Sequence, residues 1–463
     1  MKVLLIITSM VTHTIKTPHL GIGYIAACLE KEGYEVAILD EQIEKCSHNE
    51  IVNIIKERGY GAVGLTSTSE NRFHTIRLIK SIRKVFKGLI FVGGHHFTYT
   101  AKDALENIKE IDVVVRGEGE FATLELMEAY SNNREFYHIK GITFRDKDNE
   151  IIETEDRPLL KNLDLLPQVA WHLFQLKKYK TKPSDLGLSY IGVMSSRGCH
   201  YNCVFCAIKT KSVSLRSPEL FVDELEYLHD RYNPKAFQFF DSTFTINRSH
   251  CESICEEIIK RKLDIKWVAK ARINNVDESL LSLMKEAGCY KVLYGIESGS
   301  ERISKRINKN ITISQIKKAI NVSLKAGLKV TGYFMVSLPD ETLEDLKQTV
   351  DLMTELIKNE GVTTTYAYTL IYPGTELERI ALKERILPDN FSWNRYRIFP
   401  KCFITDSVKT IPYYENPNLK VGRIKLFIFM NKYIYSRGSW KLSLKTMFEM
   451  FMRIFNRVFK QVS

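Results

Sequence analysis

Short apolar runs alternate with helical patterns over about the first 130 residues of the chain. The apolar runs occupy residues 3–8, 35–40, 62–68, 89–94 and 112–117. Helical periodicity fills the intervals at residues 22–32, 49–58, 73–87 and 101–108. Strands that alternate with helices of this length predict parallel βαβ units and a doubly wound, Rossmann-like sheet. Ligands of such sheets bind beyond the carboxyl ends of the strands.

A second series of the same kind begins at Ser189. Its apolar runs occupy residues 190–195, 236–240, 265–271, 291–296, 329–336 and 364–370, with helical patterns between them. Six consecutive β/α units predict an incomplete barrel, whose chemistry lies at the carboxyl ends of its strands. The expected fold class is therefore α/β, with a Rossmann-like domain at 1–132, a linker region at 133–188, a partial (β/α)6 barrel at 189–400 and a helical tail at 401–463.

The composition fits an ordinary globular protein, with 44% hydrophobic and 26% charged residues. No apolar run reaches the roughly 18 residues of a membrane span, and the apolar start of the chain lacks the cleavage site of a signal peptide. The nine cysteines are odd in number and irregularly spaced, which favours reduced thiols and a cytoplasmic location. The net charge of +12 hints at anionic partners. A basic surface alone is poor evidence for nucleic acid, and none is expected.

Three cysteines, Cys199, Cys203 and Cys206, follow the first strand of the predicted barrel at the spacing C-x3-C-x2-C. Three thiolates on one short loop can hold three irons of a four-iron cluster, whereas such clusters normally take four cysteines. One iron would stay open, and an open site suggests chemistry. Zinc is the alternative, but zinc favours paired ligands, and no second C-x2-C or H-x3-H pair follows. His200 could complete a set, although its adjacency to Cys199 makes shared tetrahedral ligation awkward.

The cysteine loop, with Phe205 directly before the third cysteine, resembles the signature of the radical S-adenosylmethionine (SAM) superfamily. The resemblance implies that the amino and carboxylate groups of SAM chelate the open iron of a [4Fe-4S] cluster. An electron from the cluster then cleaves SAM to a 5′-deoxyadenosyl radical, which abstracts hydrogen from a substrate. The resemblance also implies an electron donor such as a flavodoxin or a ferredoxin.

Other strand ends of the barrel resemble the same superfamily, since they carry Asp241, Arg272, Glu297 and Ser298. The resemblance implies contacts with the methionine carboxylate and the ribose of SAM. Arg272 offers a bidentate fork for a carboxylate, and Glu297 or Ser298 can bond ribose hydroxyls. Relatives often carry a second acidic residue where this chain has Ser242. The alternative is that Arg272 and Glu297 simply pair with each other inside the barrel.

Small and polar residues follow three strands of the predicted doubly wound sheet. Glycines there let a ligand approach the backbone closely, although tight turns also need glycine. A doubly wound domain in front of a radical SAM barrel resembles the cobalamin-binding domain of one branch of the superfamily. The residues that this resemblance places at cobalamin are Ser67, Thr68, Gly93, Gly94, His95, Gly117 and Glu118.

The first loop departs from the pattern of many cobalamin proteins. These proteins carry D-x-H-x-x-G there, with the histidine as lower axial ligand, and the motif is absent between Thr8 and Gly21. His13 and His19 lie in this stretch, but neither has an aspartate two residues earlier. No histidine ligand from this loop is therefore expected. The alternative is that the domain keeps the fold and has lost the cofactor, because a fold does not guarantee its ligand.

The sequence beyond Pro417 is basic and aromatic, and apolar residues recur at helical spacing near its end. From Arg423 onward it contains nine Lys or Arg and the single acidic residue Glu449. A basic amphipathic helix of this kind can lie in a membrane interface. Peripheral contact with the inner membrane face and an apolar substrate would follow. The alternative is a helix that packs its apolar stripe on the barrel.

These features predict a cobalamin-dependent radical SAM enzyme that methylates an unactivated carbon of a lipid, porphyrin or natural-product substrate. No residue is assigned a catalytic role. Ring formation, oxidation or carbon–carbon coupling without methyl transfer is the close alternative. Methylthiotransferases acting on tRNA resemble this barrel but carry three cluster cysteines in the N-terminal domain, where this chain has only Cys28 and Cys46. A non-catalytic, metal-stapled scaffold is the alternative from a different class.

Overall fold

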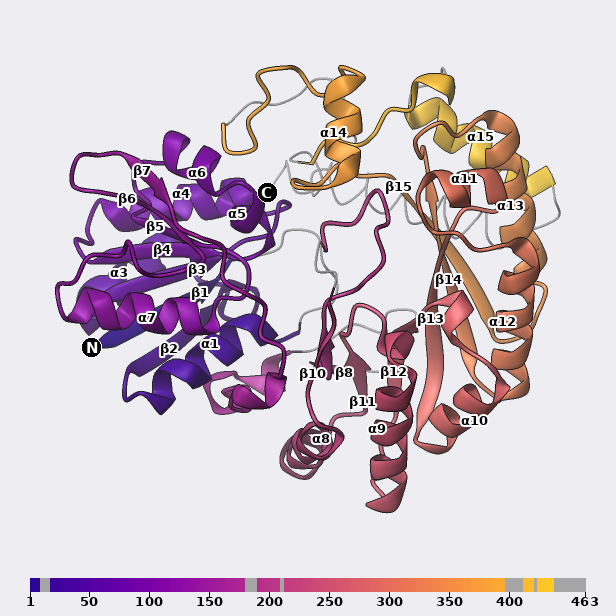
Figure 1. Cartoon of the computed structure of the whole chain (residues 1–463), viewed down its shortest axis with the longest axis horizontal. Helices are drawn as coiled ribbons and strands as arrows, with labels where there is room; N and C mark the ends of the chain where they lie inside the picture. Colours follow the sequence, from indigo (N-terminus) through magenta and orange to yellow (C-terminus); the bar gives the residue numbers. More distant parts are fainter. Residues whose placement is uncertain (9–16, 180–189, 209–211, 396–410, 420–422, 437–463) are drawn as a thin grey trace. The chain divides into compact units, whose positions relative to one another are not determined.

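The structure is a computed structural model that describes residues 1–8, 17–179, 190–208, 212–395, 411–419 and 423–436 (Figure 1). The chain divides into two compact units. The first comprises Met1–Gly192, Asp230–Pro234 and Asn390–Ile398. The second comprises Val193–His229, Lys235–Asp389 and Phe399–Ser463.

The first unit contains a seven-stranded sheet with the order β2-β1-β3-β4-β5-β6-β7. The parallel strands are β1 (Lys2–Ile7), β2 (Glu35–Asp40), β3 (Ala62–Thr66), β4 (Leu89–Gly93) and β5 (Val113–Val115). Two antiparallel strands extend the sheet, β6 (Ile142–Arg145) and β7 (Ile151–Glu153). The doubly wound sheet that the alternation predicts is therefore confirmed. The strand order reverses between β1 and β3, and ligands of such sheets bind at this switch point.

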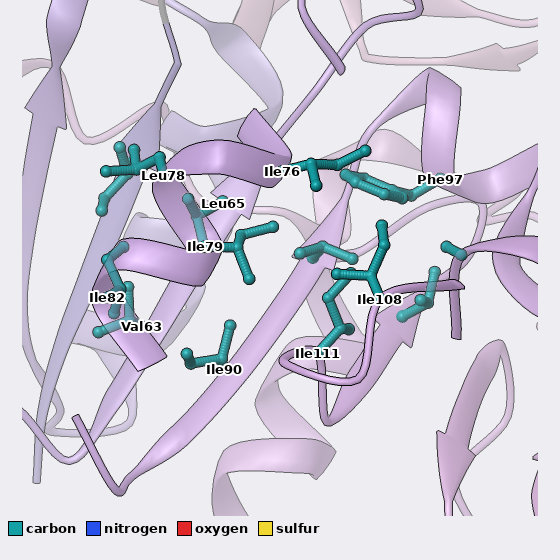
Figure 2. Packing of buried hydrophobic residues seen from close by; sticks show 14 of the residues in the cluster. Val63, Leu65, Ile76, Leu78, Ile79, Ile82, Ile90, Phe97, Ile108 and Ile111 are labelled. Atoms are coloured by element: carbon teal, nitrogen blue, oxygen red, sulfur yellow. The ribbon is translucent and has the colours of Figure 1, made fainter. Parts of the chain in front are cut away.

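Helices cover the strands of the first sheet. They are α1 (Leu20–Lys31), α2 (Glu41–Glu44), α3 (His48–Arg58), α4 (Arg72–Arg83), α5 (His95–Tyr99), α6 (Ala101–Asn107) and α7 (Glu120–Ser131). Figure 2 shows Ile76, Ile79 and Ile82 on one face of α4. They pack in one buried cluster with Val63 and Leu65 of β3. β3 is buried along its whole length and carries no polar side chain before Thr66, as expected of a strand with helices on both faces of the sheet.

Residues 133–188 do more than connect two domains. They supply β6 and β7, and then the short 3-10 turns η1 (Leu163–Leu165), η2 (Trp171–Leu173) and η3 (Leu176–Lys178). This segment packs against α1, where a Cβ added at Gly23 would lie 2.5 Å from the side chain of Val169. The boundaries at 132 and 188 stay predictions, and the compact unit itself continues to Gly192.

The second unit is built on a six-stranded sheet with the order β15-β14-β13-β12-β11-β8, in which three of the four residues of the edge strand β8 belong to the first unit. Its strands are β8 (Tyr190–Val193), β11 (Ala236–Phe239), β12 (Trp267–Ala271), β13 (Cys289–Glu297), β14 (Lys329–Val336) and β15 (Val362–Tyr368). β11 to β15 pair in parallel. Helices follow the strands: α8 (Pro218–Tyr232), α9 (Arg248–Lys260), α10 (Glu278–Glu286), α11 (Glu301–Arg306), α12 (Ile313–Lys325), α13 (Leu343–Leu356) and α14 (Glu376–Lys383). The predicted partial barrel is confirmed.

Two features were not predicted from the alternation. β9 (Ser196–Arg197) and β10 (Ser214–Leu215) form a small antiparallel pair. Helix α15 (Arg423–Ser436) falls within the predicted helical tail and lies against α13, although its bounds were not predicted, and the amphipathic pattern near residues 447–459 lies outside the described residues. Within the described part of the chain, no helix is long and apolar enough to cross a membrane.

Candidate functional site

The cysteine loop, residues 198–206, begins directly after β9. Gly198 opens it with φ of +94°, a left-handed conformation that glycine adopts readily. Its three cysteines are half-buried and free of disulfides. Burial raises the pKa of the Cys206 thiol, and the nearby Cys203 and Cys199 act in the same direction. Three free, partly accessible thiols on one short loop fit the donor set of an iron–sulfur cluster.

Backbone hydrogen bonds fix the cysteine loop to the rest of the second unit. The N–H of Val204 donates to the carbonyl of Ile307 at 3.1 Å, and the carbonyl of Val204 accepts from the N–H of Leu377 at 2.9 Å. Val204 is itself buried. Phe205, the neighbouring aromatic residue, is half-buried. The middle of the loop is therefore held by α11 and α14, while its cysteines stay partly accessible.

Asp241 holds the segment that leads into the cysteine loop. It follows β11 and is fully buried. Its carboxylate accepts hydrogen bonds from the hydroxyls of Ser195 and Ser196 at 2.7 and 2.5 Å. The N–H of Ser195 donates to it at 3.3 Å. Asp241 is thus a positioning residue for the loop, and the SAM contact expected for it stays a prediction.

Arg272 brings a buried positive charge to the cysteine loop. Its guanidinium lies 3.7 Å from the ring centroid of Tyr201, and Nη1 lies 4.0 Å from Sγ of Cys203. Nε donates to Asn274 at 2.9 Å, and Nη2 donates to the backbone oxygen of Lys309. The stack on Tyr201 and the fixed fork leave Arg272 little freedom.

Glu297 forms its ion pair with Lys309 rather than with Arg272. Oε1 of Glu297 lies 3.0 Å from Nζ of Lys309, and both side chains are buried. Glu297 has φ of +68° at a register shift between β13 and β14, which turns its side chain away from the regular pleat. The alternative pairing of Arg272 with Glu297 is therefore wrong. Sequence patterns missed Lys309 because it lies in a loop without periodicity.

Ser298 is engaged within the second unit. It is almost fully buried, and its hydroxyl lies 3.2 Å from that of Thr349 and accepts from the N–H of Ser300 at 3.1 Å. Its contact with the ribose of SAM stays a prediction. The half-buried Ser242 occupies the position where relatives often carry a second acid.

A buried polar network lies at the carboxyl ends of β1 and β3. The Asn71 side-chain oxygen accepts from the hydroxyl of Ser67 and from the N–H of Thr68, both at 2.9 Å. Its amide nitrogen donates to Thr8 at 2.9 Å. The network therefore lies at the switch point of the sheet, where a cofactor of a doubly wound domain binds. Asn71 was missed by sequence reasoning because its partner Thr8 is distant in sequence.

Gly94 packs its backbone against the end of β3. A Cβ added there would lie 2.6 Å from Oγ1 of Thr66 and 2.7 Å from the backbone oxygen of Ser67, and its φ is +92°. The neighbouring Gly93 is less confined, with Val115 at 3.4 Å from such a Cβ. The structure thus brings Ser67, Gly93 and Gly94 together at one edge of the sheet.

His19 and His95 also meet near this edge. Burial lowers the pKa of His19 to about 4, and His95 acts in the same direction. Nδ1 of His19 accepts from the N–H of Ile22 at 3.2 Å and so caps α1. His13 lies outside the described residues. The expectation that no histidine of this loop binds cobalt stays a prediction.

Gly117 and Glu118 follow β5. Gly117 has φ of +71°, and a Cβ there would meet open space. The carboxylate of Glu118 accepts from the N–H of Leu160 at 2.7 Å, which ties the turn after β5 to the segment after β7. The contact of these two residues with cobalamin stays a prediction.

Two sequence families match the two halves of the chain. The Radical SAM superfamily matches residues 193–353, and the B12 binding domain matches residues 9–127. An uncharacterized methyltransferase of Pyrococcus horikoshii is 34% identical over 408 residues, which cover 86% of each chain. The chain belongs to the radical SAM superfamily. This radical SAM enzyme carries a B12-binding domain, and its cofactors are therefore SAM, a [4Fe-4S] cluster and cobalamin.

Other relatives of this radical SAM enzyme are more distant. Cytidylyl-2-hydroxyethylphosphonate methyltransferase of Streptomyces wedmorensis is 28% identical over 394 residues, covering 73% of each chain. Anaerobic magnesium-protoporphyrin IX monomethyl ester cyclase of Rubrivivax gelatinosus is 29% identical over 341 residues, covering 72% of this chain and 61% of that one.

Solved structures share the fold of this radical SAM enzyme. The radical SAM methyltransferase TsrM of Kitasatospora setae superposes with a TM-score of 0.72 at 19% identity, covering 83% of this chain and 76% of that one. The cobalamin-dependent radical SAM enzyme OxsB superposes with a TM-score of 0.74 at 18% identity, covering 90% and 64%. Both likenesses support the predicted order of a Rossmann-like domain followed by a partial barrel.

Proposed function

We propose that this radical SAM enzyme is a C-methyltransferase, which replaces hydrogen on an unactivated carbon of a lipid, porphyrin or natural-product substrate by a methyl group. The observation that carries the proposal is the presence of the cysteine loop and the B12-binding domain in one chain. Two of the relatives above are methyltransferases by name, which supports methyl transfer over other radical chemistry.

Each part of the chain has a role in this proposal. Cys199, Cys203 and Cys206 would hold three irons of the cluster. The cluster supplies the electron that cleaves the C5′–S bond of SAM, and cobalamin supplies the carrier for the methyl group. Arg272 keeps a positive charge beside Cys203 and would orient the carboxylate of SAM through its free donor positions. Glu297 and Ser298 would contact the ribose.

The proposed reaction consumes two molecules of SAM and two electrons. One SAM accepts an electron and yields methionine and a 5′-deoxyadenosyl radical, which takes a hydrogen atom from the substrate carbon. The other SAM leaves as S-adenosylhomocysteine, and its methyl group would pass by way of cobalamin to the substrate carbon that lost the hydrogen atom, where the new carbon–carbon bond forms. The second electron restores the carrier for the next cycle. A flavodoxin or a ferredoxin would supply both electrons.

Two products distinguish the two halves of the proposal. The full chain, loaded with cluster and cobalamin and chemically reduced, should form both 5′-deoxyadenosine and S-adenosylhomocysteine from SAM. Cys203→Ala should abolish 5′-deoxyadenosine, because the cluster loses a ligand. Gly93→Leu should lower S-adenosylhomocysteine instead, because its side chain would fill space at the switch point. The Cβ of that leucine makes an ordinary contact of 3.4 Å with Val115, so the fold should tolerate it.

The second candidate is radical chemistry without methyl transfer. It has support from the relative named as a magnesium-protoporphyrin cyclase. Formation of 5′-deoxyadenosine without any S-adenosylhomocysteine would favour this candidate and contradict the proposed methyl transfer. Zinc without iron after anaerobic reconstitution would contradict both.

Peripheral membrane contact through the basic tail, residues 401–463, is a further part of the proposal. Its support is the basic and aromatic composition of the sequence from Arg423 onward, of which residues 437–463 lie outside the described residues. In a flotation gradient, the full chain should rise with vesicles of anionic lipid. It should remain at the bottom when the vesicles contain only neutral lipid. Failure to float with anionic vesicles would contradict membrane contact and leave the methyl transfer test unaffected.

A further inference from the structure

Three side chains that the proposed function does not use meet in the first unit: Glu41, His48 and His74. Each offers one ligand atom, and the three atoms lie within 4.8 Å of one another. The two carboxylate oxygens of Glu41 lie 3.0 and 2.8 Å from Nε2 of His74. Nε2 of His48 lies 3.4 Å from the same nitrogen. Among the described residues, this is the group of histidine, cysteine and carboxylate ligands that converges most closely on one point.

A single proton cannot join all three ligand atoms in hydrogen bonds at once. If Nε2 of His74 carries a proton, that one proton must serve both the Glu41 carboxylate and Nε2 of His48. If Nε2 of His48 carries the proton, Nε2 of His74 turns a lone pair toward a carboxylate. A cation, in contrast, accepts an electron pair from all three groups.

Glu41 is the most buried of the three side chains. It is only 6% exposed, and its Oε2 lies 2.8 Å from Nε2 of His74, with which it forms an ion pair when His74 is protonated. A divalent cation in place of that proton would neutralise the buried carboxylate and bind His48 as well.

Three elements hold the ligands in place. Asp40 caps α2, whose first residue is Glu41. A capping box at Ser47 fixes the start of α3, whose first residue is His48. His74 lies on α4, which contacts α3 and is anchored by the buried cluster of Figure 2. Pre-organised ligands on capped helices are what a tight metal site requires.

We propose that Glu41, His48 and His74 bind a divalent transition-metal ion of the zinc type. Two imidazoles and one carboxylate are the protein ligands of many zinc sites that keep a further position for water. Tetrahedral ligands at about 2.0–2.1 Å from zinc lie about 3.3 Å from each other, close to the 3.4 Å between the two histidine nitrogens. The ion would clip α2 and α3 to α4. The site shares no residue with the cysteine loop of the second unit.

Zinc titration of the full chain tests the proposal. The cluster is reconstituted first, so that its cysteines are occupied, and zinc is added under anaerobic conditions before gel filtration. The wild-type chain should retain one zinc per chain, measured by mass spectrometry of the metal, and zinc should raise its Tm. Glu41→Gln, His48→Ala and His74→Ala should each weaken zinc binding at least about tenfold, since even outer-shell changes have that effect.

A matched control separates this site from ordinary histidine pairs. His172 lies 3.0 Å from Glu30 in an exposed pair of the same unit, and His172→Ala should retain the zinc of the wild type. Glu41→Gln keeps the side-chain volume, so loss of zinc with an unchanged circular dichroism spectrum cannot be misfolding. The proposal is overturned if the wild type retains no zinc, or if the three variants retain it as the wild type does. It is also overturned if Cys203→Ala alone removes the zinc.

Discussion

At the scale of single residues, Arg272 is the clearest case of a side chain held in one position beside the cysteine loop. Stacking on Tyr201 and donation to Lys309 fix its guanidinium beside Cys203. Lysine would keep the positive charge but lose the planar fork and the stack. The arrangement therefore depends on guanidinium geometry and not on charge alone.

Arg272→Lys should lower the rate of 5′-deoxyadenosine formation at least about tenfold, which corresponds to about 1.4 kcal/mol of lost interaction. Cluster content, measured as iron and sulfide per chain, should stay at the wild-type value. Arg248→Lys is the control, because Arg248 forms a partly exposed pair with Asp277. Equal rates for Arg272→Lys and the wild type would show that charge suffices.

Asp241→Asn should reduce cluster content. The substitution removes the charge to which Ser195 and Ser196 donate, and a hydrogen bond to a charged group contributes about 1.5–3 kcal/mol. The cysteine loop, which follows Ser196, should then sample other conformations. Iron per chain after identical reconstitution measures the effect, and Ser196→Ala should give a smaller loss because one donor remains. Full iron content in Asp241→Asn would contradict the positioning role.

The candidate site residues that could be predicted from the sequence are those that belong to local motifs. Cys199, Cys203, Cys206 and Arg272 all follow strand ends, where spacing alone indicates chemistry. Lys309 was missed because it lies in a loop without periodicity, and its ion pair with Glu297 forms only in the folded chain. Motifs report neighbours along the chain, whereas burial and ion pairs are set by neighbours in space.

At the scale of elements, periodicity predicted the long strands and helices and missed the short ones. The run at 3–8 became β1 (Lys2–Ile7), and the run at 329–336 became β14 (Lys329–Val336). Helix α2 and the pair of β9 and β10 were missed because they are too short to show a period and contain no apolar run of the kind that marked the other short strands. Both lie at sites of interest, since α2 supplies Glu41 and β9 leads into the cysteine loop.

Thr312→Ala should destabilise the second unit by about 1 kcal/mol, because Thr312 closes a capping box with Gln315 at the start of α12. The midpoint of urea unfolding measures the change. Ser81→Ala is the control, because Ser81 lies within α4 on its solvent side and caps neither end of the helix. Loss of its hydroxyl should alter the free energy of unfolding by at most about 0.5 kcal/mol. Equal midpoints for the two variants would contradict the role of the cap.

At the scale of the whole molecule, a segment from beyond the barrel strands completes the first unit. Residues 390–398 belong to that unit, although the pattern placed them with the barrel. The backbone oxygen of Trp393 accepts from Arg72 at 2.7 Å, and Asn394 lies 3.1 Å from Nε2 of His96. These contacts join residues about 300 positions apart, and no local pattern could predict them.

His96 makes this long-range junction sensitive to pH. Burial lowers its pKa to about 3, and Arg72 acts in the same direction, whereas in the unfolded chain the pKa is about 6.5. Below pH 6.5, His96 is therefore protonated in the unfolded chain, whereas in the folded chain it stays neutral down to about pH 3. The stabilising contribution is fully present above pH 6.5 and is lost as the pH falls toward 3.

His96→Asn should accordingly flatten the pH dependence of stability. Near pH 5 one such group contributes a slope of about 1.4 kcal/mol per pH unit, and its removal should lower the measured slope by about that amount. Urea unfolding at several values between pH 5 and 6.5, followed by circular dichroism, gives the slope. Ser69→Ala breaks a hydrogen bond of the same ring, 3.0 Å long, but leaves the titrating group in place, so it should shift the curve without flattening it. If the free energy of unfolding depended on pH in the same way in His96→Asn and the wild type, a group other than His96 would cause the loss of stability in acid.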